Sequence, residues 1–425
     1  MRTIKSVQDY FFKRTGFLAS LMTFFAVIGP GIITSNVDND AGGISTYSIA
    51  GAHFGYRLLW SIIPIIIILI ITQEMNARMG VVTGKGLSDL IREKFGLKIT
   101  FYLLLALFFT NLGNVMANFS GVAASLEIFG VSKYFSVPLA AFFIWWLIVK
   151  GNYKSVEKVF FVAVLFYSSY ILSGFLAKPN WNDTLLATIK PNFDFQPNFL
   201  IILVGLVGTS VAPWQFFYLQ ASTVEKGIKV EEYKYARLDV ILASISCMIV
   251  AYFIIVACAA TLFKAGIRIE NAKDAALALK PLAGKYCSAL FAFGLLNASL
   301  FAASIIPLST TYTICEGMGF ESGLDRRFRD APQFYGLYTA LIVIGAGVVL
   351  IPRFPLLTVM VVSQVINGIL LPFILIFMLS LTNRKDLMEN YTNSKIVKLI
   401  AWLIVFVLTL LNLFMLVTLI FPLAK

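Results

Sequence analysis

Two carboxylates inside an apolar stretch are the side chains of this chain with the clearest capacity for chemistry. Asp38 and Asp40 lie in the segment 35–43, Ser-Asn-Val-Asp-Asn-Asp-Ala-Gly-Gly, with apolar residues before and after it. A charged side chain at the centre of a membrane-spanning helix costs about 2.5–3.5 kcal/mol on insertion scales, and such residues mark ion pathways. Gly42 and Gly43 favour an irregular backbone, which persists at membrane depth only inside protein or beside a cavity. The segment predicts a broken helix with a cation site; a polar re-entrant loop or a structural kink is the alternative.

A second polar interruption lies in the apolar stretch 197–221. Thr209 and Ser210 are followed by Pro213, which lacks a backbone donor and clashes with the preceding helical turn. This pattern predicts a second broken helix with backbone carbonyls available for binding. Broken helices at matching positions of two halves indicate a transporter site at the interface between the halves.

Together the two breaks predict a cation site made of oxygen atoms. Asp40 is the expected principal ligand with Thr209 beside it, and Gly42, Gly43 and Ala212 are expected to keep the site roomy. Oxygen ligands suit hard cations such as magnesium, calcium or manganese. Because magnesium sheds its water reluctantly, a wide site favours a hydrated magnesium ion. The single histidine, His53, has no ligand partner close in sequence, and we interpret it as a loop residue.

Composition places the chain among polytopic membrane proteins. Of its 425 residues 59% are hydrophobic and 13% are charged, and the mean hydropathy is +0.84, whereas soluble proteins have about 25% charged residues. The net charge of +12 does not indicate nucleic-acid binding, because the basic residues lie in short loops between apolar spans. The four cysteines show neither metal-site spacing nor a disulfide framework.

Apolar stretches of about 20 residues predict an all-α protein with eleven spans, of which the first and sixth are broken. They cover about 18–53, 58–79, 99–130, 134–150, 156–178, 197–221, 237–263, 286–315, 335–351, 355–381 and 396–422. Breaks five spans apart predict two halves, 18–178 and 197–381, related as a five-plus-five inverted repeat. The helix 396–422 is then an addition to a single transporter domain over 1–425.

The distribution of Lys and Arg predicts the orientation in a cell membrane. Most of the 34 basic residues fall on one side if the N-terminus is cytoplasmic, which leaves the C-terminus outside. The basic stretch 264–285 then lies on the opposite side, against the trend.

Polar residues elsewhere in the spans allow two interpretations. Asn111, Asn114 and Asn118 step by three and four residues and share one helix face. They form either a hydrated permeation wall or interhelical hydrogen bonds, worth about 0.6 kcal/mol each. Glu74 and Arg78 are four residues apart and are interpreted as a structural ion pair.

Several motifs resemble those of the natural-resistance-associated macrophage protein (NRAMP) metal transporters. They are Gly-Pro-Gly at 29–31, Asp-Ala-Gly-Gly at 40–43, Ala-Gly-Ala-His-Phe-Gly-Tyr at 50–56, Ser-Gln-Val at 363–365, Leu-Pro-Phe at 371–373, and the tail segments 393–395 and 401–403. The resemblance covers nearly the whole chain. It implies the amino-acid-transporter-like (LeuT-like) inverted-repeat fold and adds Gln364 to the expected metal ligands.

The departures from the family pattern bear on the substrate. Gly43 stands where the family has a ligand Asn, Ala212 where it has the metal-selecting Met, and Trp214 where it has a His linked to proton movement. Acidic positions of the family's third span align with Val115 and Asn118. A soft thioether favours transition metals, so its loss removes that discrimination. These changes resemble the NRAMP-related magnesium transporter branch.

We therefore expect the protein to transport divalent cations as hydrated ions without proton coupling. Magnesium is the main expected substrate, and manganese is a second one. Residues expected to have secondary roles at the site are Asp38, Asn36, Ala41, Ser210, Trp214, Asn114 and Asn118. The expected partners are the metal ion and the lipid bilayer, with no nucleic acid, no resident cofactor and a monomeric state. A proton-coupled manganese or iron importer is one alternative, and a sodium-coupled organic-solute symporter is another. An intramembrane enzyme finds no supporting motif.

Overall fold

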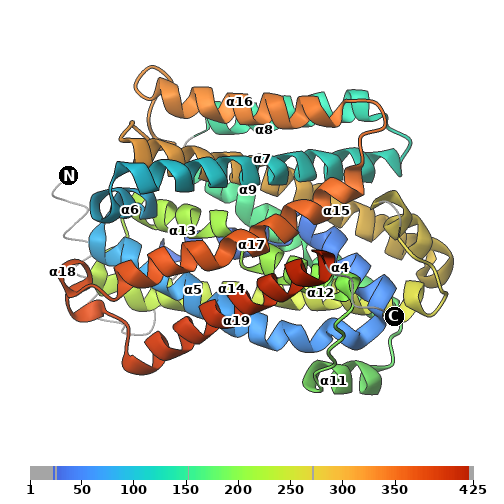
Figure 1. Ribbon diagram of the computed structural model, residues 1–425. Coiled ribbons are helices and arrows are strands. Elements are labelled where there is room, and N and C mark those ends of the chain that lie inside the picture. Colours follow the sequence, from blue (N-terminus) through green and yellow to red (C-terminus); the bar gives the residue numbers. More distant parts are fainter. Residues whose placement is uncertain (1–22, 24–25, 152, 270–271, 421–425) are drawn as a thin grey trace, which may run out of the picture.

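The computed structural model describes residues 23, 26–151, 153–269 and 272–420. The basic N-terminal segment and the first residues of the predicted first span lie outside this part of the chain. Within it the protein is built of helices, most of which run side by side along one direction (Figure 1). Ten described helices are long and apolar enough to cross a membrane.

The helices fall into two groups by their sequence position. Those of the first half are α3 (Pro30–Val37), α4 (Ala41–Phe54), α5 (Ile62–Thr83), α6 (Leu87–Phe95), α7 (Leu97–Glu127), α8 (Lys133–Lys150), α9 (Tyr153–Phe166), α10 (Ser168–Leu176) and α11 (Trp181–Ile189). Those of the second half are α12 (Pro197–Ser210), α13 (Pro213–Glu225), α14 (Tyr233–Cys258), α15 (Ala272–Met318), α16 (Pro332–Val349), α17 (Leu356–Thr382), α18 (Lys385–Met388) and α19 (Lys395–Ile420).

The difference between eleven predicted and ten observed spans arises where the first and second spans join. Helical geometry continues from α4 through a 3-10 stretch, Gly55–Ser61, into α5, so that Ala41–Thr83 forms one run of 43 residues. A straight helix of that length would measure about 65 Å, twice the thickness of a bilayer core. Gly55 ends α4 with φ +58, and both α4 and α5 pack against the single helix α14. The two predicted passes are therefore distinct.

Two further predictions need correction. His53 lies in the last turn of α4 and not in a loop, because helical hydrogen bonding continues to Phe54. Helix α15 begins at Ala272, so part of the stretch expected to be an outer loop is helical, whereas the apolar span within this helix, Ala289–Met318, lies close to the predicted 286–315.

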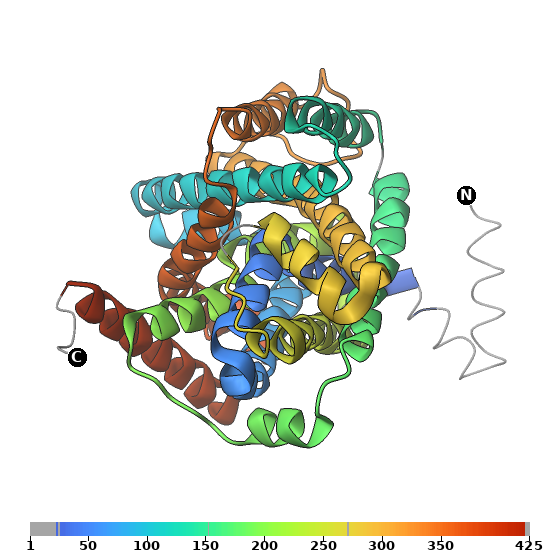
Figure 2. The ribbon, with the colours of Figure 1, turned by 90° about the vertical axis from the view of Figure 1, so that its right-hand side faces the viewer.

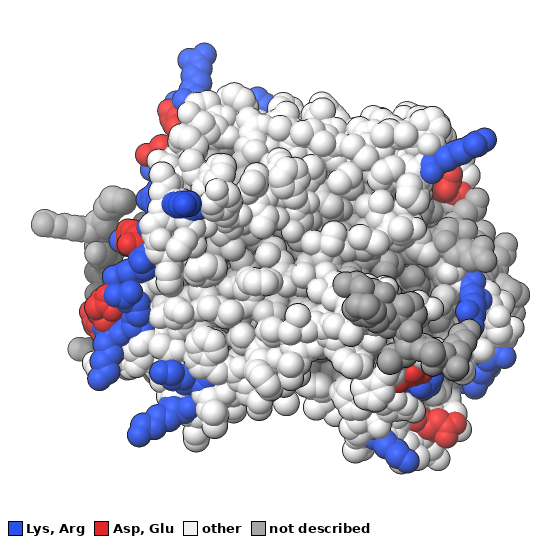
Figure 3. Space-filling model, viewed as in Figure 1, with Lys and Arg blue, Asp and Glu red and all other residues white. Residues whose placement is uncertain are grey.

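The centre of the bundle is formed by the two interrupted helices. Figure 2 shows α4 surrounded by other helices and α19 at the periphery. Nearly all of the run Pro197–Glu225 is buried, whereas α8 and α19 expose large apolar side chains such as Phe142 and Phe406. Charged side chains gather at the two ends of the molecule, and the surface between them is almost free of charge (Figure 3). This distribution is that of a protein whose middle lies in lipid.

Candidate cation site

The first helix break lies where the sequence predicts it. Helix α3 ends at Val37, and α4 begins at Ala41 after three residues outside the helices. Asp40 is the N-cap of α4 and accepts a hydrogen bond of 2.6 Å from the backbone N–H of Gly43. Asp is a favoured N-cap because its carboxylate satisfies an otherwise unpaired N–H at the positive end of the helix.

The second break is also confirmed. Helix α12 ends at Ser210, Val211 and Ala212 leave the helical conformation, and α13 begins at Pro213. Proline suits the first helical position because it has no N–H to satisfy there. The Thr209 hydroxyl donates a hydrogen bond of 3.1 Å to the Asp38 carbonyl, so the two breaks are in direct contact.

Oxygen atoms from both breaks converge beside Gly43. A Cβ placed on this residue would lie 2.5 Å from the Asp38 carbonyl oxygen, 2.6 Å from Thr209 Oγ1 and 3.4 Å from Asp40 Oδ1. A Cβ on Gly42 would collide with the Gln364 amide. The expectation that glycine keeps the site roomy is wrong for this conformation, because the missing side chains instead let the breaks approach closely.

The Asp40 carboxylate is surrounded by hydrogen-bond donors from two other helices. Asn118 Nδ2 on α7 donates to Oδ2 at 3.0 Å, and Gln364 Nε2 on α17 lies 3.2 and 3.4 Å from the two oxygens. Asn118 also accepts a hydrogen bond of 3.1 Å from the Ala41 N–H. The structure thus brings together Asp40, Thr209, Gln364 and Asn118, as the sequence predicts.

The asparagine face of α7 makes interhelical hydrogen bonds. Asn114 and Asn367 exchange amide hydrogen bonds of 3.1 and 3.2 Å, and Asn367 donates to Gln364 Oε1 at 2.9 Å. Asn111 donates to Thr310 at 2.9 Å. This observation favours the hydrogen-bond interpretation over a hydrated wall. Asn367 is visible in the sequence as a polar residue inside a span, and here it bridges Asn114 and Gln364.

The second break is supported by a separate set of contacts. The hydroxyls of Ser210 and Tyr47 lie 3.0 Å apart, and Gln215 Nε2 donates to the Ser210 carbonyl at 3.3 Å. Gln215 also accepts a hydrogen bond from Gln73. Trp214 is buried and accepts a hydrogen bond of 2.9 Å from Ser309 through its carbonyl. Sequence reasoning missed Tyr47 and Gln215, whose partners come from distant segments.

The Asp38 carboxylate lies in different surroundings from those of Asp40. Its residue is 2% exposed, and neither oxygen accepts a hydrogen bond from any residue that the structure describes. The Gln215 amide lies within interaction range of it. The next residue, Asn39, donates to the Cys247 carbonyl at 3.1 Å, so this side of the break faces α14.

The start of α3 is anchored by a buried carboxylate that sequence reasoning missed. Asp239 on α14 accepts hydrogen bonds from the backbone N–H groups of Gly29, Gly31 and Ile32 at 3.3, 2.7 and 3.2 Å. A carboxylate at a helix N-terminus is favourable because of the positive end of the helix dipole. Lys226 donates to the Ile28 carbonyl and pairs with Glu157, both at 2.7 Å.

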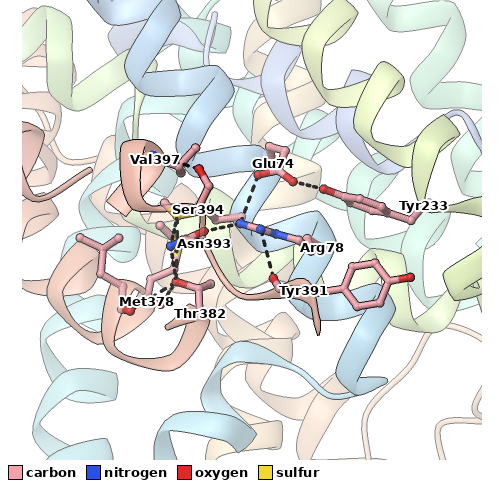
Figure 4. A network of polar contacts seen from close by, with 11 residues as sticks. Glu74, Arg78, Tyr233, Met378, Thr382, Tyr391, Asn393, Ser394 and Val397 are labelled. Carbon is pink, nitrogen blue, oxygen red and sulfur yellow. Dashed lines mark hydrogen bonds and ion pairs between the residues drawn. The ribbon is translucent and has the colours of Figure 1, made fainter. Parts of the chain in front are cut away.

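A polar network joins several helices at the end of the molecule that carries α18. Arg78 pairs with Glu74 at 3.4 Å, as the sequence predicts. Figure 4 shows that Tyr233 also donates to Glu74, while Arg78 donates to the Tyr391 carbonyl at 3.1 Å and to Asn393. The network ties α5 to α14 and to the segment that precedes α19.

No described histidine contacts either break, and the Cys247 thiol accepts a hydrogen bond of 3.4 Å from Asn39 beside the first break. Across the described residues there is no group of three or more His, Cys, Asp and Glu side chains that could hold a metal ion. The site therefore offers carboxylate, carbonyl, hydroxyl and amide oxygens, which are hard ligands.

Comparisons with known proteins bear on the family and the fold. The family described as "Natural resistance-associated macrophage protein-like" matches residues 31–418. A "Divalent metal cation transporter MntH" of Bacillus subtilis is 26% identical over 426 residues, 97% of this chain and 96% of that protein. The crystal structure of the Eremococcus coleocola manganese transporter superposes with a TM-score of 0.76 at 20% identity and covers 97% of this chain and 90% of that one.

Another solved structure shares this fold. The structure of MhsT in complex with L-phenylalanine superposes with a TM-score of 0.62 at 13% identity, over 93% of this chain and 97% of that one. At such low identity the likeness concerns the fold alone. It confirms the predicted all-α LeuT-like architecture.

Proposed function

The chain belongs to the natural resistance-associated macrophage protein family, and we propose that it carries hard divalent cations across the membrane between its two helix breaks. The observation that carries the proposal is the convergence of the Asp38 carbonyl, the Thr209 hydroxyl and the Asp40 carboxylate beside Gly43. Oxygen ligands of this kind suit magnesium, calcium and manganese. Membership of a transporter family also agrees with the prediction that the protein is not an enzyme.

Magnesium is the substrate that the composition of the site favours. The second break offers Ala212 and no sulfur or imidazole ligand, so this break has no soft group that would select a transition metal. Gln364 and Asn118 supply amides around Asp40, and these orient its carboxylate without adding charge. A site with few charged ligands is compatible with an ion that keeps part of its water shell.

Manganese is the second candidate, and the names of the relatives favour it. The similar proteins are called divalent metal cation transporters, and the superposed structure is called a manganese transporter. These names support manganese transport more directly than magnesium transport. Manganese is also a metal that accepts octahedral oxygen coordination, so the same site accommodates both candidates.

We further propose that uptake follows the membrane potential without a coupled proton. A divalent ion gains about 4.6 kcal/mol per 100 mV of inside-negative potential, at about 2.3 kcal/mol per charge. That free energy corresponds to a more than thousandfold accumulation of the ion inside. The orientation with a cytoplasmic N-terminus in the cell membrane, the monomeric state and the repeat boundaries 18–178 and 197–381 remain predictions.

The test is flux into proteoliposomes that hold a potassium-diffusion potential, with magnesium, manganese and calcium supplied in turn. Saturable magnesium uptake that manganese inhibits is the expected result. Manganese uptake with no magnesium uptake would replace the main proposal by the second candidate. Uptake of neither ion, with the protein folded and inserted, would contradict divalent transport.

A further inference from the structure

The Asp38 carboxylate is a buried acidic group whose interacting neighbour, the Gln215 amide, carries no charge. The residue is 2% exposed, and neither side-chain oxygen meets a well-aligned hydrogen-bond donor in the described part of the chain. The nearby Gln215 amide donates to the Ser210 carbonyl and accepts from Gln73. A buried carboxylate that is ionised is strongly destabilising unless a counter-charge reaches it or a proton neutralises it.

The atoms around Asp38 are suited to a cation and unsuited to an anion. Asp38 is the C-cap of α3, where the helix dipole adds negative potential. The side-chain hydroxyl of Ser35 is buried and also has no hydrogen-bond partner within the residues described. Ser35 precedes Asp38 by three residues and therefore lies on the same face of α3.

The two carboxylates of the first break face different helices. Asp40 receives its donors from α7 and α17, whereas Asp38 lies near Gln215 of α13 and Cys247 of α14. The Asp38 backbone carbonyl, in contrast, faces Thr209 beside the Asp40 site. A single residue thus contributes its carbonyl to one oxygen cluster and its carboxylate to another.

We propose that the Asp38 carboxylate forms a second divalent-cation station, next to the Asp40 site and on the side of α3. The Ser35 hydroxyl is its neutral partner, and water completes the shell of a hard ion there. This inference rests on the proposed function. It assigns the unpaired charge of the first break to cation binding, while the charge of Asp40 is already met by protein donors.

The test compares Asp38→Asn with Asp40→Asn, and it uses Glu127→Gln, an exposed carboxylate at the end of α7, as the matched control. The melting temperature of the purified full-length protein is measured in chelator, in magnesium chloride and in sodium chloride of equal ionic strength. In chelator we expect Asp38→Asn to melt higher than the wild type, because an unpaired buried charge is removed. Magnesium should stabilise the wild type and Glu127→Gln, since a ligand that binds the folded state raises its stability. It should stabilise Asp38→Asn by less than half as much.

Each contrary result has one meaning. A magnesium-induced shift that is unchanged in Asp38→Asn but lost in Asp40→Asn would overturn the second station and leave the proposed function standing. An equal shift with sodium would show a monovalent site and overturn the divalent assignment. No shift and no flux in the wild type would contradict the proposed function itself.

A direct readout keeps the proposal testable if the variant does not fold. Crystals of the wild type soaked in manganese chloride should show an anomalous peak beside the Asp38 carboxylate in addition to any peak at Asp40. Anomalous density at Asp40 alone would overturn the second station.

Discussion

The two helix breaks face each other but contribute different chemistry. The first, between α3 and α4, carries Asp38 and Asp40, whereas the second, between α12 and α13, carries no charged residue. Asp40 is held by donors from α7 and α17, while Thr209 contributes a neutral hydroxyl that reaches across to the Asp38 carbonyl. The first break therefore supplies the charge, and the second supplies neutral oxygen atoms. Changes at the first break should control whether an ion binds, and changes at the second should control which ion binds.

The largest effect is expected from removing the charge of the first break. Asp40→Ala should reduce magnesium flux by at least about tenfold, because a charged ligand and its hydrogen bonds of about 1.5–3 kcal/mol are lost. The Asn118 and Gln364 amides also lose their acceptor. Flux into proteoliposomes, normalised to the amount of inserted protein, measures the effect. Uptake at the wild-type rate would show that the carboxylate is not a ligand and would favour the polar-loop interpretation.

A smaller loss is expected when the breaks are forced apart. In Gly43→Asn the new side chain meets the Asp38 carbonyl and Thr209, whose oxygens lie 2.5 and 2.6 Å from its Cβ position. Overpacking of this kind typically costs about 1–3 kcal/mol, so we expect a lower melting temperature and a several-fold lower magnesium flux. Wild-type stability and flux would mean that the breaks are not in contact in the transporting protein.

The contact at Gly43 also shows a feature that the sequence alone does not predict. Both breaks are predictable because Gly42, Gly43, Pro213 and the carboxylates leave strong local signals. The sequence predicts that Gly42 and Gly43 make space, yet in the structure they let the two breaks approach closely. A missing side chain has the same sequence signature in either case. Local patterns cannot decide between the two, because the answer depends on where another helix lies.

Partners across long sequence separations are missed for the same reason. Asp239 caps α3 from more than 200 positions away, and Asn367 reaches Asn114 from another distant span. Each of these residues is visible as a polar side chain in an apolar run. What the pattern lacks is the pairing, which follows only from the packing of α14 on α3 and of α17 on α7.

A shift in preference, and not a loss of transport, is expected at the second break. Ala212→Met places a thioether where the break has only a methyl group, and a soft ligand favours transition metals. Manganese binding should tighten relative to magnesium by about tenfold, or about 1.4 kcal/mol. Isothermal titration with each ion measures the ratio. An unchanged ratio would show that ligand softness does not set selectivity here; the Gly43→Asn and Ala212→Met double variant then separates softness from site width.

The smallest expected effect concerns protons. We expect no proton to move with the ion, because the second break carries no group that titrates near neutral pH. A proton that travels with the ion needs a group that titrates along the path, such as a histidine or a buried carboxylate. The second break offers Trp214, and α7 offers Val115 and Asn118, none of which exchanges a proton near neutral pH.

Between the two breaks, only the first carries carboxylates that a coupled proton could use. There Asp40 accepts hydrogen bonds from Gly43, Asn118 and Gln364, so protein donors already lie against its oxygens. A cation at Asp38 would compete with a proton for the same oxygens. Magnesium uptake should thus carry two charges per ion and leave a pH-sensitive dye inside the liposomes unchanged. Acidification that requires magnesium and disappears in Asp38→Asn would make Asp38 a proton carrier, and the two breaks would then differ in coupling as well as in charge.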